Sequence, residues 1–196
     1  MARPKSFSSD DLYERALMRF WHRGFEGTSI DDLVKATGIS RHGIYTEAGG
    51  KKALYLRCFD HYQATVVSPA LRAVEVDGAG LTEIAGYFEH QIAVAEKDGL
   101  PGPGCFVANA STETAPHDGD VHDKVHQHNA RLKLAFAKTL KNTNTKALDD
   151  AALARIADGL VIFATGLWSM SRLTPSADPL RAAVNETLQM IEARLR

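Results

Sequence analysis

The chain has 196 residues, 44% of them hydrophobic and 24% charged, and its formal net charge is -1. These values are typical of a folded globular protein and exclude collagen-like, low-complexity and disordered classes. The length suits a small head joined to a larger body. Residues 1–60 hold ten Lys or Arg and eight Asp or Glu, so positive charge leans toward the N-terminal third.

No targeting or membrane segment is expected. Residues 1–6 are followed by no apolar stretch of the kind found in signal peptides. The longest apolar run, near residues 160–168, is far shorter than the roughly 20 residues that cross a bilayer. Two cysteines, Cys58 and Cys105, are too few for a disulfide framework. We therefore expect a cytoplasmic protein with no membrane partner.

Helical periodicity runs through the chain without sustained period-2 alternation, so the expected fold class is all-α. Ser8 and Asp11 have the spacing of a capping box and predict a first helix that ends near Gly24. Thr28 and Asp31 repeat that signal and predict a short second helix.

Gly38 should end the second helix, and Ser40 should cap a third, still shorter one that reaches about Tyr45. A long segment follows Gly49-Gly50, with Pro69 as a possible kink. We divide the chain into a head, residues 1–50, and a body, residues 51–196. The body helices are expected over residues 51–76, 81–97, 105–114, 120–141, 149–173 and 178–196.

Residues 28–54 have the organisation that a DNA-reading helix pair requires. Gly38 permits a tight turn, and Ile39 can fill the angle between two short helices. With its Thr-Ser-Ile opening, its Gly-Ile-Ser turn and its Gly-Gly-Lys-Lys-Ala-Leu exit, this segment resembles the helix-turn-helix of the TetR family of bacterial regulators. The resemblance implies a three-helix DNA-binding head, a long connecting helix and a helical-bundle domain for effector binding and dimerisation, with no cofactor and no enzymatic activity.

The resemblance also implies which side chains meet the double-stranded DNA. Arg41, His42 and Gly43 would face base edges, and Arg41 can donate two hydrogen bonds to guanine. Arg3 and Lys5 could add a basic arm. Two residues depart from the family pattern: Ala48 replaces an aromatic core residue, and Glu47 would repel phosphate unless it pairs with a cation or a cytosine amino group. The positions expected to contact phosphate are Thr28, Ser40, Tyr45 and Lys51.

Residues 103–109 are similar to a GC(L/F)xxN segment found in a branch of TetR-like regulators, where it opens a helix that lines the ligand cavity. A pocket for a small molecule needs apolar walls and a few polar groups. The candidates are Tyr87, Phe88, Cys105, Phe106, Asn109, Glu113, Asn129, Phe163 and Trp168.

Two further chemistries stay open. Cys105, at an expected helix N-terminus, is either a sensing thiol, a nucleophile with a histidine and Asn129, or a small buried residue. His122 and His126 have the i, i+4 spacing of a metal pair and lie near His117 and His128, although solvated helices often collect such residues, and we assign no metal.

The expected helix over residues 149–173 is apolar nearly all round, with Gly159 and Gly166 permitting close approach, and the final helix offers a second apolar stripe. Two copies could form an intersubunit four-helix bundle. The expected protein is a homodimer that binds a palindromic operator, with recognition helices about 34 to 36 Å apart, and that a small-molecule effector releases or alters. Members of the family are more often repressors than activators, so we expect a repressor. A thiol-gated regulator, a small thiol enzyme and a helical interaction module are the alternatives.

Overall fold

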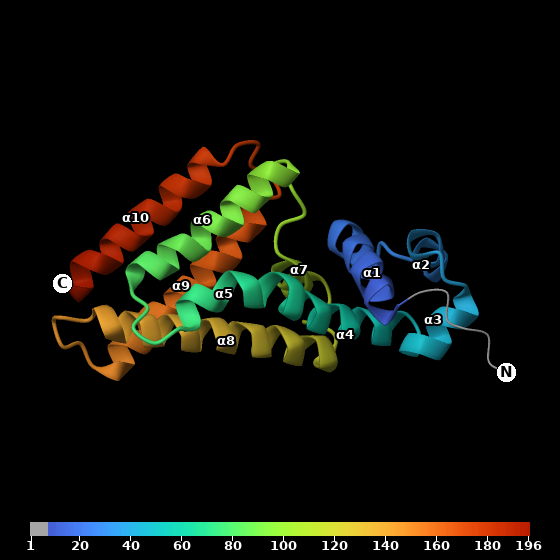
Figure 1. Cartoon of the computed structure of the whole chain (residues 1–196), viewed down its shortest axis with the longest axis horizontal. Coiled ribbons are helices and arrows are strands. Elements are labelled where there is room, and N and C mark those ends of the chain that lie inside the picture. Colours follow the sequence, from blue (N-terminus) through green and yellow to red (C-terminus); the bar gives the residue numbers. More distant parts are fainter. Residues whose placement is uncertain (1–7) are drawn as a thin grey trace.

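A computed structural model describes residues 8–196, and every regular element in that range is a helix, which confirms the expected all-α class (Figure 1). The elements are α1 (Ser9–Arg23), α2 (Ile30–Thr37), α3 (Arg41–Ala48), α4 (Lys51–Tyr62), the π-helix η1 (Gln63–Val67), α5 (Ser68–Glu75), α6 (Leu81–Asp98), α7 (Phe106–Glu113), α8 (Gly119–Thr143), α9 (Asp150–Met170) and α10 (Asp178–Leu195).

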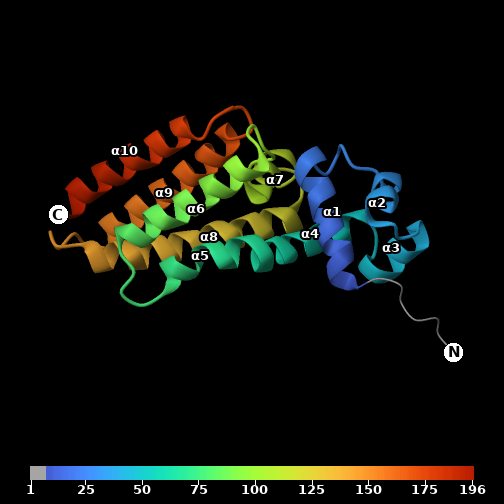
Figure 2. The same cartoon turned by 45° about the horizontal axis from the view of Figure 1, so that its top comes forward.

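The head consists of α1, α2 and α3 gathered around the start of α4, at one end of the molecule (Figures 1 and 2). Ser8 caps α1 through the expected capping box with Asp11. The second capping box uses Ser29 and Asp32, one residue later than expected. Both signals were present in the sequence, and the one whose hydroxyl stays outside the head core forms the cap.

Aromatic rings from α1, the following turn and α4 fill the head's core. Phe20 and Phe25 each lie 4.9 Å from Tyr55, measured between ring centroids. Ile39 and Ile44 are buried beside them. Ala48 is half-buried against this core. The small side chain at this position, where the family pattern has an aromatic residue, therefore still contributes to the packing.

The helix that joins head and body is interrupted by a π turn rather than by a simple kink. The five-residue η1 lies between α4 and α5, directly before the first turn of α5, which contains Pro69. Proline lacks an amide hydrogen and clashes with the carbonyl four residues earlier. A wider turn relieves that clash, and π turns are often found at functional sites.

In the body, α8 packs along α9, and α6 packs between α5 and α10. Figure 2 shows α7 between these long helices and α1. Among the described residues, α9 is the one helix long and apolar enough to cross a membrane by length and composition alone. Leu153, Ala157 and Leu160 of α9 are buried, whereas Ile162 and Met170 on the same helix are exposed. An apolar helix with one buried side and one open side is also typical of a subunit interface.

Candidate DNA-binding interface and effector cavity

The third helix presents its first turn to solvent at the end of the molecule farthest from α10 (Figure 1). The Ser40 side chain caps α3 by accepting a hydrogen bond from the Gly43 amide. Arg41, His42 and Tyr45 are exposed, Tyr45 to 52%. Gly43 is half-buried, and a side-chain carbon there would lie 2.7 Å from Cγ2 of Ile39. The segment therefore offers an arginine, an imidazole and a phenol on one accessible turn.

Arg41 forms an ion pair with Asp31 of α2, 2.8 Å from guanidinium to carboxylate. Their side chains are 60% and 70% exposed. Ion pairs this exposed are worth about 0–1 kcal/mol. The guanidinium can therefore leave Asp31 for a base edge at little cost.

Two residues that were expected to contact phosphate are not fully exposed. Thr28 is fully buried and donates its hydroxyl to the Gly24 carbonyl at 2.8 Å, so the expectation that it offers this hydroxyl to phosphate is wrong. Lys51 is half-buried, with its ammonium 4.1 Å from the centre of the Phe25 ring. Glu47 is half-buried on α3. Arg3 and Lys5 lie outside the described residues.

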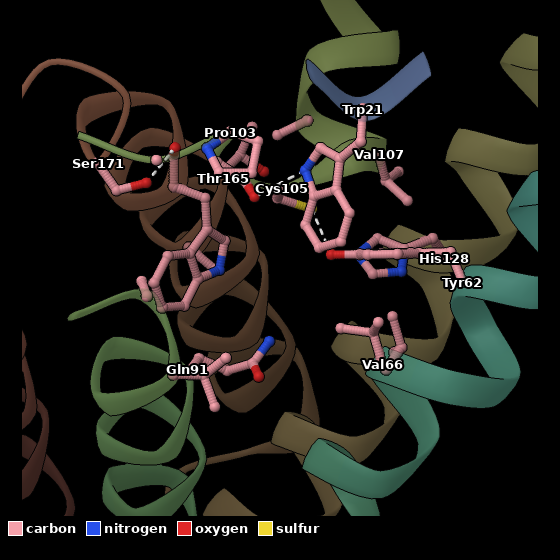
Figure 3. A pocket seen from close by; sticks show the side chains of 18 of the residues that line it. Trp21, Tyr62, Val66, Gln91, Pro103, Cys105, Val107, His128, Thr165 and Ser171 are labelled. Atoms are coloured by element: carbon pink, nitrogen blue, oxygen red, sulfur yellow. Dashed lines mark hydrogen bonds between the residues drawn. The ribbon is translucent and has the colours of Figure 1, made fainter. Parts of the chain in front are cut away.

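A cavity of about 120 Å³ lies in the body where α4, η1, α6, α7, α8 and α9 meet the end of α1 (Figure 3). Its walls include four aromatic residues: Trp21, Tyr62, Tyr87 and Trp168. These include both tryptophans of the chain. Polar side chains such as Gln91 of α6, Asn129 of α8 and Thr165 of α9 interrupt a mostly apolar lining. The result is a concave, mostly apolar site of the kind that takes small organic molecules.

The structure brings four of the expected pocket residues to this cavity: Tyr87, Cys105, Asn129 and Trp168. The other five expected residues do not line the cavity, so the prediction is corrected for them. Phe88, Phe106 and Phe163 pack in aromatic clusters of the core, because helical periodicity marks an inward face without distinguishing core from cavity.

Asn109 and Glu113 serve the backbone instead of a ligand. The Asn109 amide donates to the Pro103 carbonyl at 2.8 Å and fixes the loop before α7. The Glu113 carboxylate accepts hydrogen bonds from the backbone amides of Phe25 and Glu26, at 3.1 and 2.9 Å. Short-range sequence patterns gave no sign of either pairing, and the one made by Glu113 joins positions 88 and 87 residues apart.

Trp21, Tyr62, Gln91 and His128 line the cavity and were missed. Trp21 belongs to α1, the first helix of the head. Its indole nitrogen donates to the Gly104 carbonyl at 3.0 Å, which places a head residue in the cavity wall. Gly104 has φ +73°, and a side-chain carbon there would lie 2.7 Å from the Trp168 carbonyl oxygen. Only glycine fits between α1 and α9 at this point.

Cys105 is buried at the N-cap of α7 and accepts a hydrogen bond from the Tyr62 hydroxyl, 3.5 Å from oxygen to sulfur. Burial raises the pKa of its thiol above the usual value, and the hydrogen bonds from Tyr62 and the α7 amides offset this only in part. The geometry thus favours a packed thiol over a sensing or catalytic one. Its hydrogen-bonding partner is a tyrosine, not the histidine that a catalytic pair needs.

The four histidines separate in space. His117, His122 and His126 are exposed, whereas His128 is buried. Between residues 8 and 196, no group of three or more His, Cys, Asp or Glu is placed to hold a metal ion. Burial lowers the pKa of His128 to about 4, with a smaller contribution from the charge of Arg131. This imidazole is therefore neutral at physiological pH.

An exposed helix-turn-helix attached to an all-helical body with an apolar cavity defines a DNA-binding transcriptional regulator. The family model described as "Bacterial regulatory proteins, tetR family" matches residues 12–58, and "Tetracyclin repressor-like, C-terminal domain" matches residues 80–187. The chain belongs to the TetR family, whose members are regulators and not enzymes.

Relatives and solved structures agree with this assignment. The HTH-type transcriptional regulator YezE of Bacillus subtilis is 26% identical over 198 residues, covering 98% of this chain and all of that protein. The HTH-type transcriptional repressor ComR of Escherichia coli is 30% identical over 61% of this chain and 57% of its own length. A cysteine mutant of the TetR family regulator CifR, complexed with 26-bp operator DNA, superposes with a TM-score of 0.84 at 22% identity, covering 95% of this chain and 98% of its own.

The buried neutral His128 predicts a pH-dependent stability. Its pKa is about 6.5 in the unfolded chain and about 4 in the folded one, so the unfolded state binds the proton first as pH falls. Stability is full above pH 6.5 and is lost as pH falls toward 4, with a loss of about 2 kcal/mol by pH 5. Urea unfolding at about pH 7.5 and about pH 5 measures this difference in the free energy of unfolding.

His128→Leu should remove this part of the pH dependence, while His126→Leu, on the exposed side of α8, should leave it unchanged. Equal pH dependence in the wild type and His128→Leu would contradict the assignment of a buried neutral ring.

Proposed function

We propose that the protein is a cytoplasmic repressor that binds a palindromic operator as a homodimer and is released when a small-molecule effector enters the cavity. The observation that carries this proposal is the place of Trp21, a residue of the DNA-binding head that also lines the cavity. The operator complex of CifR and the repressor name of ComR support the DNA-binding half.

The proposed coupling uses two contacts between head and body. Trp21 donates to Gly104 at the cavity wall, and Glu113 of α7 accepts from the turn that follows α1. An effector that moves the indole would change the orientation of α1, and α2 and α3 would follow because they pack on it and on α4. Typical allosteric couplings of about 1–3 kcal/mol are within reach of a few such hydrogen bonds.

The proposed dimer uses the open faces of α9 and α10. Ile162 is 72% exposed and Met190 66% exposed. Gly159 and Gly166 have open space where a side chain would stand, so a second helix could approach closely. An apolar face this open is costly in an isolated subunit and is typical of a partner surface. Pairing through it would make a four-helix bundle with twofold symmetry.

Arg41→Ala tests the proposed reading of DNA. With duplexes selected from a random pool, the variant should bind about 10- to 100-fold more weakly and should discriminate less at one guanine per half-site. Tyr45→Phe should weaken binding uniformly across sequences, because a phosphate contact carries no base information. Gel-shift titration gives both values.

Lys97→Ala is the matched control, since Lys97 is an exposed cation on α6 in the body. Unchanged affinity in an Arg41→Ala, Tyr45→Phe double variant would refute the assignment of α3 as the recognition helix.

Ile162→Arg tests the proposed dimer. A charge on this open apolar face should convert a dimer to a monomer in sedimentation equilibrium and reduce operator affinity, because only paired heads span both half-sites. Leu134→Arg is the control, since Leu134 of α8 is equally exposed, at 73%. A wild-type protein that sediments as a monomer, or an Ile162→Arg variant that stays dimeric, would disprove this interface.

A further inference from the structure

The hydrogen-bond donors that face the cavity define what it can bind. His128 is 7% exposed and lines the cavity. Its Nδ1 lies 2.9 Å from the side-chain amide nitrogen of Gln63, in the π turn. An amide nitrogen can only donate, so Nδ1 must accept. The proton of the neutral ring is therefore on Nε2, and Gln63 fixes this tautomer.

The Nε2–H group is a donor in need of an acceptor. Within residues 8–196 no protein atom accepts a hydrogen bond from it. The same holds for the side-chain amides of Gln91 and Asn129, which also line the cavity and, among the described residues, have no hydrogen-bond partner. The His128 ring is 7% exposed, whereas Gln91 and Asn129 are half-buried. A bound molecule that supplies an acceptor would complete the hydrogen bonding of this ring.

Charge in the lining disfavours anions. Among the described residues that line the cavity there is no Lys or Arg, and the one ionised side chain is the exposed carboxylate of Asp98. The neutral His128 adds no positive charge, and the nearby guanidinium of Arg131, whose charge acts on His128, is already paired with Glu75. An anion placed here would lose its hydration without gaining a counter-charge, which is strongly unfavourable.

The walls favour a flat molecule. Trp21 lies edge-to-face against Tyr62, with ring centroids 5.1 Å apart. Figure 3 shows these two rings and His128 together on one side of the cavity, with Gln91 across from them. Aromatic faces attract flat apolar rings and add to the free energy of simple burial. A planar molecule between these walls would place an edge atom within reach of Nε2–H.

We propose that the cavity binds an uncharged, flat organic molecule with a hydrogen-bond acceptor such as a carbonyl oxygen, and that His128 Nε2–H is the donor that orients it. The inference rests on the proposed function, because it specifies the effector of the same cavity. Gln63 acts as a positioning residue because it fixes the tautomer of His128. It lies in η1, which directly follows α4, the helix that leads from the head into the body.

Three probes of matched shape test this: acetophenone, α-methylstyrene, which has a methylene group in place of the oxygen, and benzoate. The two tryptophan indole N–H resonances of the dimeric protein report binding, since both side chains line the cavity. Acetophenone should shift both resonances saturably, α-methylstyrene should bind about tenfold more weakly, and benzoate should shift neither.

His128→Leu should weaken acetophenone about tenfold and leave α-methylstyrene unchanged, while His126→Leu should affect neither. Gln63→Leu keeps the imidazole but no longer fixes its tautomer, so this variant should lower the affinity for acetophenone by a smaller factor. Thermal melting and circular dichroism confirm that each variant is folded.

Several outcomes would overturn the inference: no saturable binding of acetophenone, equal affinity for ketone and alkene, binding of benzoate, or equal loss of both neutral probes in His128→Leu. A failure of the operator-binding proposal looks different, because it appears in the Arg41 variants and leaves these probe affinities unchanged.

Discussion

The hydrogen bond from the Trp21 indole to the Gly104 carbonyl is the contact on which the link between head and cavity depends. It makes a residue of the first head helix part of the cavity wall. Gly104 can hold its carbonyl there because it has no side chain to meet α9. Glu113 adds a second contact one helix further on. Under the proposed mechanism, a rearrangement of the cavity wall at Trp21 is transmitted through α1 to the helix-turn-helix.

The sequence predicted the head well because its signals are local. Capping residues, the glycine turn and the apolar stripes act over a few positions, and the continuous resemblance over residues 28–54 added spacing to them. The shift of one residue at Thr28 came from two adjacent hydroxyl residues that can both cap a helix, serine somewhat better than threonine. Burial decided between them, and burial depends on α1 and α4, which the local pattern does not include.

The cavity was harder to predict because it depends on contacts between distant residues. Phe88 and Tyr87 are neighbours on α6, yet only Tyr87 lines the cavity. For Cys105, the helix N-terminus and burial act in opposite directions on the thiol pKa, and burial prevails. A sequence shows the first influence and hides the second. His128 lies near three other histidines in the sequence, and its burial and its hydrogen bond with Gln63 separate it from them.

The most direct test of the proposed link between cavity and DNA needs no effector. The proposed coupling is reciprocal, so under this proposal operator DNA bound at the head alters the cavity wall. In protein with 15N-labelled tryptophan, the Trp21 indole resonance is assigned by comparison with Trp168→Phe. Saturating operator duplex should shift the Trp21 resonance, although this indole lies in the wall of the cavity. A Trp21 resonance that is unchanged while the heads are bound to DNA would contradict the account.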